Sequence, residues 1–229
     1  TGSLDDETLR NLSERLVALR AIEERREDVF RLISEQGKMT PEIEKALAAA
    51  ESVSEIDDIY RPYRPKRRTR ASIAIEKGLE PLADILLAQE PGLDLVKAAS
   101  AFVDEEKGVT SAEEALAGAR DIIAERVSDT AEFRKWIRDY TFDNALLVSK
   151  AKQEEDSVYR QYYDFSEPLK RIPSHRTLAI NRGEREGFLS VKVEVDEERI
   201  IGFLKERMCR KDPAPSTAEV AAAVEDAYK

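Results

Sequence analysis

Two prolines, three residues apart, interrupt a chain that is otherwise patterned for helices. Pro62 and Pro65 lie in the repeat Tyr-Arg-Pro-Tyr-Arg-Pro at residues 60–65. A proline inside a helix lacks a backbone donor and clashes with the preceding turn, and it favours extended geometry in the residue before it. Because a period of three matches a polyproline II helix, the repeat predicts an extended segment with arginines along one edge. Those arginines are Arg61, Arg64, Arg67 and Arg70.

The same segment reverses the charge of the chain. The formal net charge is −10, yet six of the ten residues at positions 61–70 are basic and none is acidic. We call residues 60–70 the basic stretch. Its tyrosines and basic residues are Tyr60, Tyr63, Arg61, Arg64, Lys66, Arg67, Arg68 and Arg70.

Two interpretations of the basic stretch stay open. In the first, its cations contact the phosphates of RNA or DNA, and Tyr60 and Tyr63 offer rings on which bases stack. In the second, the arginines pair with the surplus carboxylates of the same chain and hold a loop between helices. A stretch beside a continuous positive groove would favour the first interpretation, and one set against carboxylates would favour the second.

Most of the remaining sequence predicts helices. The first helix runs from about residue 4 to residue 36, with Ser3 as its N-cap and Gly37 at its end. We expect its apolar seam to pack within the chain. The residues of this seam are Leu9, Leu12, Leu16 and Leu19. Further helices are expected at about residues 41–50, 71–77, 82–89, 94–102, 110–127, 129–140, 198–209 and 216–229, and after Ser174.

The pattern changes after Asn144. Residues 145–149 and 188–195 have the apolar content and alternation of strands, and they predict a small sheet. The predicted fold class is mainly α: an irregular multi-helix array with a long N-terminal helix and a small β element in the last third. A boundary at this point would divide the chain into a helical domain at residues 1–144 and a mixed helical and small-sheet segment at residues 145–229.

Few residues in this chain suit catalysis or metal binding. The single histidine, His175, has no base or nucleophile that the sequence identifies beside it, and with Cys209 it lacks the clustered spacing of a zinc site. Adjacent carboxylates such as Asp57-Asp58 are too common among 47 acidic residues to mark a site. We therefore expect no enzyme, no metal and no cofactor. A second basic cluster, which could lie near the basic stretch, consists of His175, Arg176, Arg182 and Arg185.

Composition indicates the cellular compartment of the protein. Hydrophobic residues make up 41 % of it, enough for a core, but no apolar run approaches the roughly 18 residues of a membrane span. The sequence has no signal-peptide pattern, and its lone cysteine is typical of a reducing compartment. We expect a cytoplasmic protein with no membrane partner. Because net negative charge repels phosphate, any binding of nucleic acid must be local.

Several motifs, taken in order, resemble those of a known family. They are DIYRPYRPKRRT at residues 58–69, GLEPLA at residues 78–83, FSEPL at residues 165–169, IPSHR at residues 172–176 and the first six residues, with Arg182-Gly183 in addition. This set is similar to the signature of the Tex family, which are bacterial transcription accessory proteins. The matches extend to about residue 190 and cover most of the chain.

The resemblance implies a function and a set of partners. The chain would be the N-terminal and central helical region of a Tex-like protein, and we expect it to be an excised piece without the ribonuclease H-like, helix-hairpin-helix and S1 domains. Its expected function is a non-catalytic scaffold that helps bind RNA or DNA, contacts the transcription machinery and joins the remaining domains of the full-length chain. The alternative is a pure protein–protein interaction scaffold, with nucleic acid bound only by the missing S1 domain.

Overall fold

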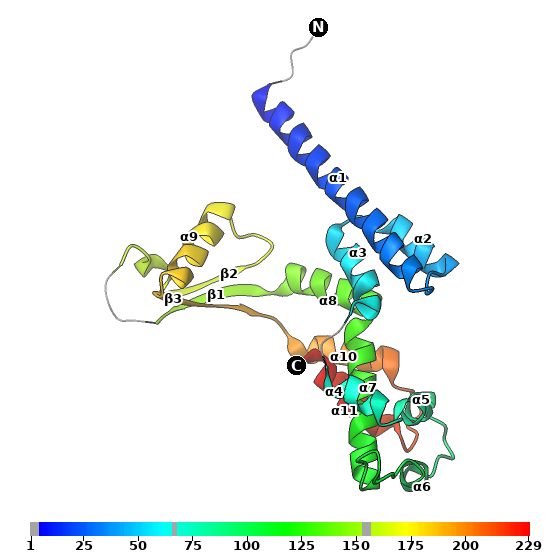
Figure 1. Ribbon diagram of the computed structural model, residues 1–229. Helices are drawn as coiled ribbons and strands as arrows, with labels where there is room; N and C mark the ends of the chain where they lie inside the picture. The colour runs from blue at the N-terminus through cyan, green and yellow to red at the C-terminus, as the bar shows by residue number, and fades with distance from the viewer. Residues whose placement is uncertain (1–4, 66–67, 153–156) are drawn as a thin grey trace. The chain divides into compact units, whose positions relative to one another are not determined.

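Helices dominate the computed structural model, which describes residues 5–65, 68–152 and 157–229. The predicted fold class, mainly α with a long first helix and a small sheet in the last third, is confirmed (Figure 1). The helices are α1 (Asp6–Glu35), α2 (Pro41–Ala49), α3 (Val53–Tyr60), α4 (Arg70–Glu76), α5 (Glu80–Ala88), α6 (Leu95–Ser100), α7 (Ala112–Asp129), α8 (Ala131–Asn144), α9 (Ser174–Arg185), α10 (Glu197–Met208) and α11 (Thr217–Tyr228). Short 3-10 helices are η1 (Arg61–Tyr63) and η2 (Arg160–Tyr162).

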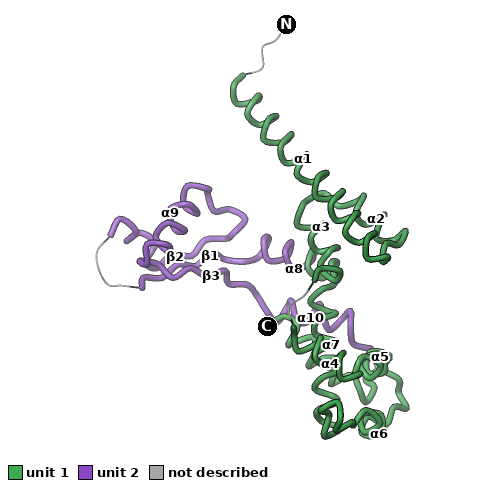
Figure 2. The backbone as a smooth tube through the Cα atoms, viewed as in Figure 1, with its two compact units in different colours: residues 1–135, 212–229 green, residues 136–211 purple. Residues whose placement is uncertain are grey.

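The chain divides into two compact units (Figure 2). The first unit contains residues 1–135 and 212–229, and the second contains residues 136–211. The division along the chain falls within α8, and the C-terminal helix α11 returns to the first unit. The first unit is therefore built from two separate parts of the sequence. The domain boundary near Asn144 stays a prediction.

Helix α1 begins and ends at residues that suit a helix terminus. The Asp5 carboxylate accepts a 2.7 Å hydrogen bond from the Thr8 backbone N–H, which makes Asp5 the N-cap. Ser3, the cap predicted from the sequence, lies outside the described residues. At the other end, Gly37 has a φ of +67°, a conformation that glycine adopts without steric cost.

The two halves of α1 differ in burial. Val29 and Ile33 are fully buried in a cluster with residues of α2 and α3, among them Leu47 and Ile56. The leucine seam of the first half, by contrast, is between 46 and 60 % exposed. The expectation that this seam packs within the chain is therefore wrong. Among the described elements, the short helices α2 and α3 cover only the second half of α1 (Figure 1).

Helix α7 is the central element of the first unit. Helices α4, α5, α6 and α11 all pack against it. Its inward residues are small or branched and almost completely buried: Ala115, Ala119, Ile122, Ile123 and Val127. At Gly118 its backbone comes so close to the turn before α5 that an added Cβ would collide with Leu79 and lie 3.3 Å from the Ala74 Cβ. Helix α7 is thus the frame to which the segments on both sides of the basic stretch are attached.

The second unit contains a three-stranded antiparallel sheet with the strand order β2-β1-β3. Its strands are β1 (Leu146–Ala151), β2 (Asp164–Pro168) and β3 (Leu189–Glu194). The two predicted strands correspond to β1 and β3 and pair with each other, with Leu147 opposite Val193. The third strand, β2, was not predicted because its sequence DFSEP has one large apolar residue, Phe165, and ends in a proline. Helix α9 packs against β3, where Ile180 and Leu189 are fully buried.

Candidate functional site

The basic stretch begins as the end of a helix. Tyr60 is the last residue of α3, and η1 follows it directly. Arg61 has a φ of −51° and a ψ of −44° although it precedes a proline. The extended conformation starts only at Arg64, with a φ of −66° and a ψ of 136°. The predicted polyproline II helix is therefore wrong for residues 60–63, and Lys66 and Arg67 lie outside the described residues.

The position of Pro62 explains why the helical path continues. Pro62 lies in the first turn of η1, where a missing N–H costs no hydrogen bond and the fixed φ suits a helix. On the preceding turns of α3, Ile56 and Tyr60 are buried in the core cluster and hold the backbone in helical geometry. The packing of these buried side chains overrides the local preference of the residue before proline for extended geometry.

The two tyrosines of the basic stretch occupy different environments. Tyr60 is 6 % exposed, and the guanidinium groups of Arg25 and Arg64 lie over its ring at 5.7 and 5.9 Å from the centroid. The Tyr60 side chain is therefore part of the core, and its ring makes two cation–π contacts. Tyr63 is half-buried, and its backbone carbonyl accepts a 3.0 Å hydrogen bond from the Gln36 side-chain amide.

Arg61 forms an ion pair that reaches across the first unit. Its Nε donates a 2.8 Å hydrogen bond to Oδ1 of Asp129, which is 68 residues further along the chain at the end of α7. The Asp129 side chain is only 9 % exposed, whereas that of Arg61 is 41 % exposed. The pair thus joins the end of α3–η1 to the end of α7, at a carboxylate that is nearly shielded from water.

Arg70 forms the second long-range connection. It is the first residue of α4, and its Nη2 lies 2.6 Å from Oδ2 of Asp226 on α11. Its Nε lies 3.5 Å from Oδ1 of Asp121 on α7. The hydrogen bond to Asp226 and the charge of Asp121 raise the pKa of Arg70. Burial raises the pKa of the Asp121 carboxyl, an effect that Arg70 opposes.

The remaining arginines of the described stretch are more exposed. Arg68 pairs with Glu76 at 3.1 Å, but both side chains are more than 60 % exposed. Within the described part of the chain, Arg64 pairs with no carboxylate, and its guanidinium lies over the Tyr60 ring. Exposed ion pairs contribute only about 0–1 kcal/mol each. Arg61 is therefore the member of the stretch whose removal should cost the most stability.

The carboxylates before the basic stretch are part of the same network, which sequence reasoning missed. Asp57 accepts hydrogen bonds from Arg25 of α1, the shorter at 2.6 Å. Asp58, which is 6 % exposed, accepts a 2.6 Å hydrogen bond from Nε of Arg134 on α8. The one available signal was an acidic pair directly before a basic block, and such pairs are too common to identify a site.

The match to known proteins decides the family. A model of the family described as Tex central region-like matches residues 90–224. The chain belongs to the Tex family. The protein YhgF of Escherichia coli is 48 % identical over 86 % of this chain, and the Tex protein of Bordetella pertussis is 44 % identical over 90 % of it. The transcriptional accessory protein Tex of Neisseria gonorrhoeae is 42 % identical over 85 % of it.

This Tex-family chain corresponds to a part of its relatives. It spans 26 % of YhgF, 28 % of the Bordetella protein and 26 % of the Neisseria protein. A more distant relative, the human S1 RNA-binding domain-containing protein 1, is 29 % identical over 91 % of this chain, which spans 21 % of that protein. The activities and partners of the full-length relatives can therefore only be proposed for this chain.

The second basic cluster lies on α9 in the second unit of the Tex-family chain. Arg176 donates a 2.7 Å hydrogen bond to Glu167 of β2, and Arg182 donates a 2.9 Å hydrogen bond to Glu186. The bonds from Arg182 and from the Tyr159 hydroxyl lower the pKa of Glu186. The other members, His175 and Arg185, are exposed. That this cluster lies near the basic stretch stays a prediction.

Among the residues that the structure describes, no group of three His, Cys, Asp or Glu side chains is placed to hold a metal ion. Burial raises the pKa of the half-buried Cys209 thiol, which disfavours the reactive thiolate. None of the helices that the structure describes is both long and apolar enough to cross a membrane.

Proposed function

We propose that this chain is a non-catalytic helical scaffold of a Tex-family transcription accessory protein, and that its basic stretch is an internal clamp. The name of the Neisseria relative, a transcriptional accessory protein, supports a role in transcription. Within this proposal the chain joins the remaining domains of the longer protein and contacts the transcription machinery through its surface. We propose that the chain has this function in the cytoplasm, where bacterial transcription occurs.

The Arg61–Asp129 pair is the observation that carries the clamp. It connects the end of α3–η1 to α7 at a carboxylate that is 9 % exposed. Arg70 then connects α4 to α7 and α11 through Asp121 and Asp226. Since both ends of the basic stretch bind carboxylates of the same chain, the arginines are placed to hold the helices together.

A second candidate function, contact with nucleic acid, is favoured by one observation. The side chains of Arg68 and Arg70 are 71 and 70 % exposed although they are ion-paired. A phosphate can compete for such cations because exposed pairs contribute little. In this candidate, Arg64, Arg68 and Arg70 together with Lys66 and Arg67 contact RNA or DNA, and Tyr63 stacks on a base.

A salt series separates the two candidates. We would measure binding of single-stranded RNA and of duplex DNA to the parent chain and to the triple variant Arg64→Gln, Arg68→Gln, Arg70→Gln. Three lost single-strand phosphate contacts would flatten the log–log salt slope by about 2, at about 0.7 per contact. The clamp predicts no such change and weak binding by the parent. A slope that flattens by about 2 in a variant that stays folded would overturn the clamp and favour contact with nucleic acid.

A further inference from the structure

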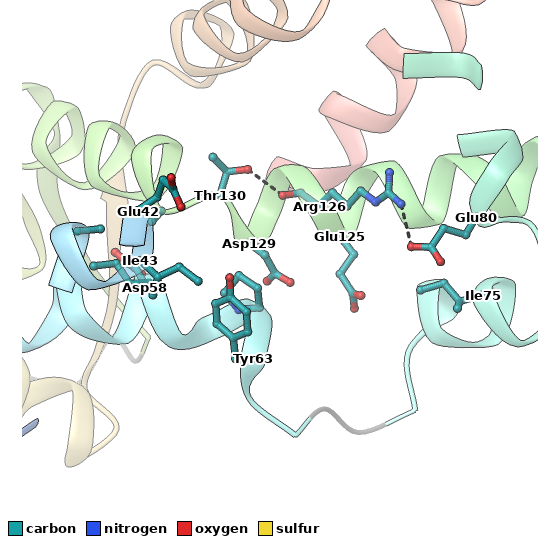
Figure 3. A pocket seen from close by; sticks show the side chains of 14 residues that line it. Glu42, Ile43, Asp58, Tyr63, Ile75, Glu80, Glu125, Arg126, Asp129 and Thr130 are labelled. Atoms are coloured by element: carbon teal, nitrogen blue, oxygen red, sulfur yellow. Dashed lines mark hydrogen bonds and ion pairs between the residues drawn. The ribbon is translucent and has the colours of Figure 1, made fainter. Parts of the chain in front are cut away.

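A hollow in the first unit lies beside the clamp and is lined mostly by acidic and apolar residues (Figure 3). It has a volume of about 640 Å³ and lies between α2, the α3–η1 segment, the α4–α5 turn and α7. A second hollow of about 200 Å³ adjoins it and shares four lining residues with it. The shared residues are Ala46, Asp58, Ile59 and Ala131. The two hollows adjoin each other at α3, and together we call them the acidic groove.

The inner surface of the acidic groove is apolar. Ile43, Ile59 and Tyr63 are half-buried in it, and Ile75 is 41 % exposed at one end. Alanines of α2 and α8 line the narrower part, and their short side chains leave room for another backbone to approach. A channel with spaced apolar anchors and small residues between them fits an amphipathic helix, which presents side chains at positions i, i+3, i+4 and i+7.

The rim of the acidic groove has an excess of negative charge. Five carboxylates and one arginine line the larger hollow, and the smaller one adds Glu55, Glu132 and Lys135. Asp129 and Asp58 pair with Arg61 and Arg134, and the lining still carries more negative than positive charges when these two arginines are counted. The carboxylates of the larger hollow are Glu42, Asp58, Glu80, Glu125 and Asp129.

One rim carboxylate, that of Glu42, has a lowered pKa. The backbone N–H of Glu42 and the Thr40 hydroxyl lower the pKa of the Glu42 carboxyl. Glu42 belongs to the first turn of α2, and its side chain borders the opening. A groove with this charge repels the phosphates of nucleic acid and attracts lysine and arginine.

We propose that the acidic groove docks a lysine- and arginine-rich amphipathic helix of a partner protein. The apolar face of that helix contacts Ile43, Ile59, Tyr63 and Ile75, and its basic residues flank the groove and approach the rim carboxylates. The inference rests on the proposed scaffold function and gives the scaffold a partner class. It uses a surface separate from the exposed arginines of the basic stretch.

The test is a binding titration with a designed peptide. The probe is a short fluorescein-labelled helical peptide with leucine at positions i, i+3, i+4 and i+7 and lysine or arginine elsewhere. Its controls are a scrambled peptide of the same composition and a peptide with glutamate in place of each basic residue. We expect the 229-residue chain to bind the probe, as measured by fluorescence anisotropy, and to bind both controls at least about tenfold more weakly.

Matched double variants assign the binding to the groove. The variant Glu42→Gln, Ile75→Ser removes one rim charge and one apolar anchor. The control Glu44→Gln, Val96→Ser removes a first-turn charge of the same helix and an apolar side chain that is 69 % exposed on α6. We expect the groove variant to bind the probe about tenfold more weakly and the control variant to bind it within about twofold of the parent. Circular dichroism of both variants would check that they stay folded.

Three outcomes would overturn the inference. They are equal losses in the two double variants, equal binding of the scrambled peptide, and no binding of the probe below about 1 mM. A failure of the proposed clamp is a different result, because it shows as a flatter salt slope with nucleic acid in the triple arginine variant. If the triple arginine variant still binds the peptide, the groove and any phosphate-binding site are separate surfaces.

Discussion

Arg61 and Arg64 allow a matched test of the clamp. Both are arginines that precede a proline in the same repeat, and glutamine in place of either removes one positive charge from the basic stretch. Arg61 pairs with a carboxylate whose side chain is 9 % exposed, and Arg64 lies over the Tyr60 ring. We predict that Arg61→Gln lowers the free energy of unfolding substantially and that Arg64→Gln hardly changes it.

The magnitude follows from the burial of the pair. Removing one partner of a fully buried pair costs about 3–5 kcal/mol, and a hydrogen bond to a charged group contributes about 1.5–3 kcal/mol. Water reaches the Arg61 side chain, which is 41 % exposed, so the lower part of this scale applies. We expect Arg61→Gln to lower the free energy of unfolding of the first unit by about 2 kcal/mol. Arg64→Gln removes an exposed cation–π contact and should change it by less than about 1 kcal/mol.

Urea unfolding and calorimetry provide the measurement. A loss of 2 kcal/mol raises the unfolding constant by a factor of about 30 and lowers Tm by about 4–8 °C in a domain of this size. The two units can unfold separately, so the comparison applies to the transition that includes α7. Equal and small shifts in both variants would refute the reasoning, because Arg61 would then contribute no more than an exposed charge.

Four further predictions concern other parts of the fold. Gly118→Ala should lower the free energy of unfolding by about 1–2 kcal/mol in urea unfolding because the new Cβ collides with Leu79. Gly202→Ala in α10 should raise it by about 0.5–1 kcal/mol because nothing lies within 4 Å of the new Cβ. Leu12→Ser should change it by less than about 0.5 kcal/mol and Ile33→Ala should lower it by about 2–4 kcal/mol, since the two residues are 60 and 0 % exposed. Thr110 and Lys77 lower the pKa of the Glu114 carboxyl below its ordinary value. The stabilisation by this carboxylate is therefore present above the ordinary pKa and is lost as pH falls through the lower, folded pKa.

The last two predictions have defined contradicting outcomes. For Glu114→Gln, the Tm would be measured by circular dichroism from pH 7 to pH 3. Its Tm should lie below that of the parent at pH 7, and the difference should become smaller as the pH falls. A difference that stays constant would show that ionisation of Glu114 does not contribute to the pH dependence of stability. For the leucine seam, a loss in Leu12→Ser as large as that in Ile33→Ala would mean that the first half of α1 is packed.

Local chemistry made much of the fold predictable. Helix α2 begins where Thr40 caps the chain and Pro41 takes the first position, and α4 begins at the Thr69 cap. These signals act within a few residues, as a capping hydrogen bond does. The same is true of β3, where apolar and polar side chains alternate from residue to residue.

The candidate site depended on contacts that are distant in the sequence. Arg61 and Asp129 are 68 residues apart, and Asp129 is one of 47 acidic residues. Nothing in the local sequence distinguishes that carboxylate from the others. The helical path through Arg61 and Pro62 likewise depends on the burial of Tyr60 against α1, which overrides a local preference for extended backbone. The acidic groove was not predicted, since its walls come from five or more separate elements.

A double-mutant cycle tests the clamp most directly. The free energy of unfolding would be measured by urea denaturation for the parent, Arg61→Gln, Asp129→Asn and the double variant. The cycle isolates the interaction between the two side chains from other contacts of Asp129. The internal clamp predicts a coupling free energy of about 1–2 kcal/mol. A coupling below about 0.3 kcal/mol would show that Arg61 does not hold α7, and the central claim would fail.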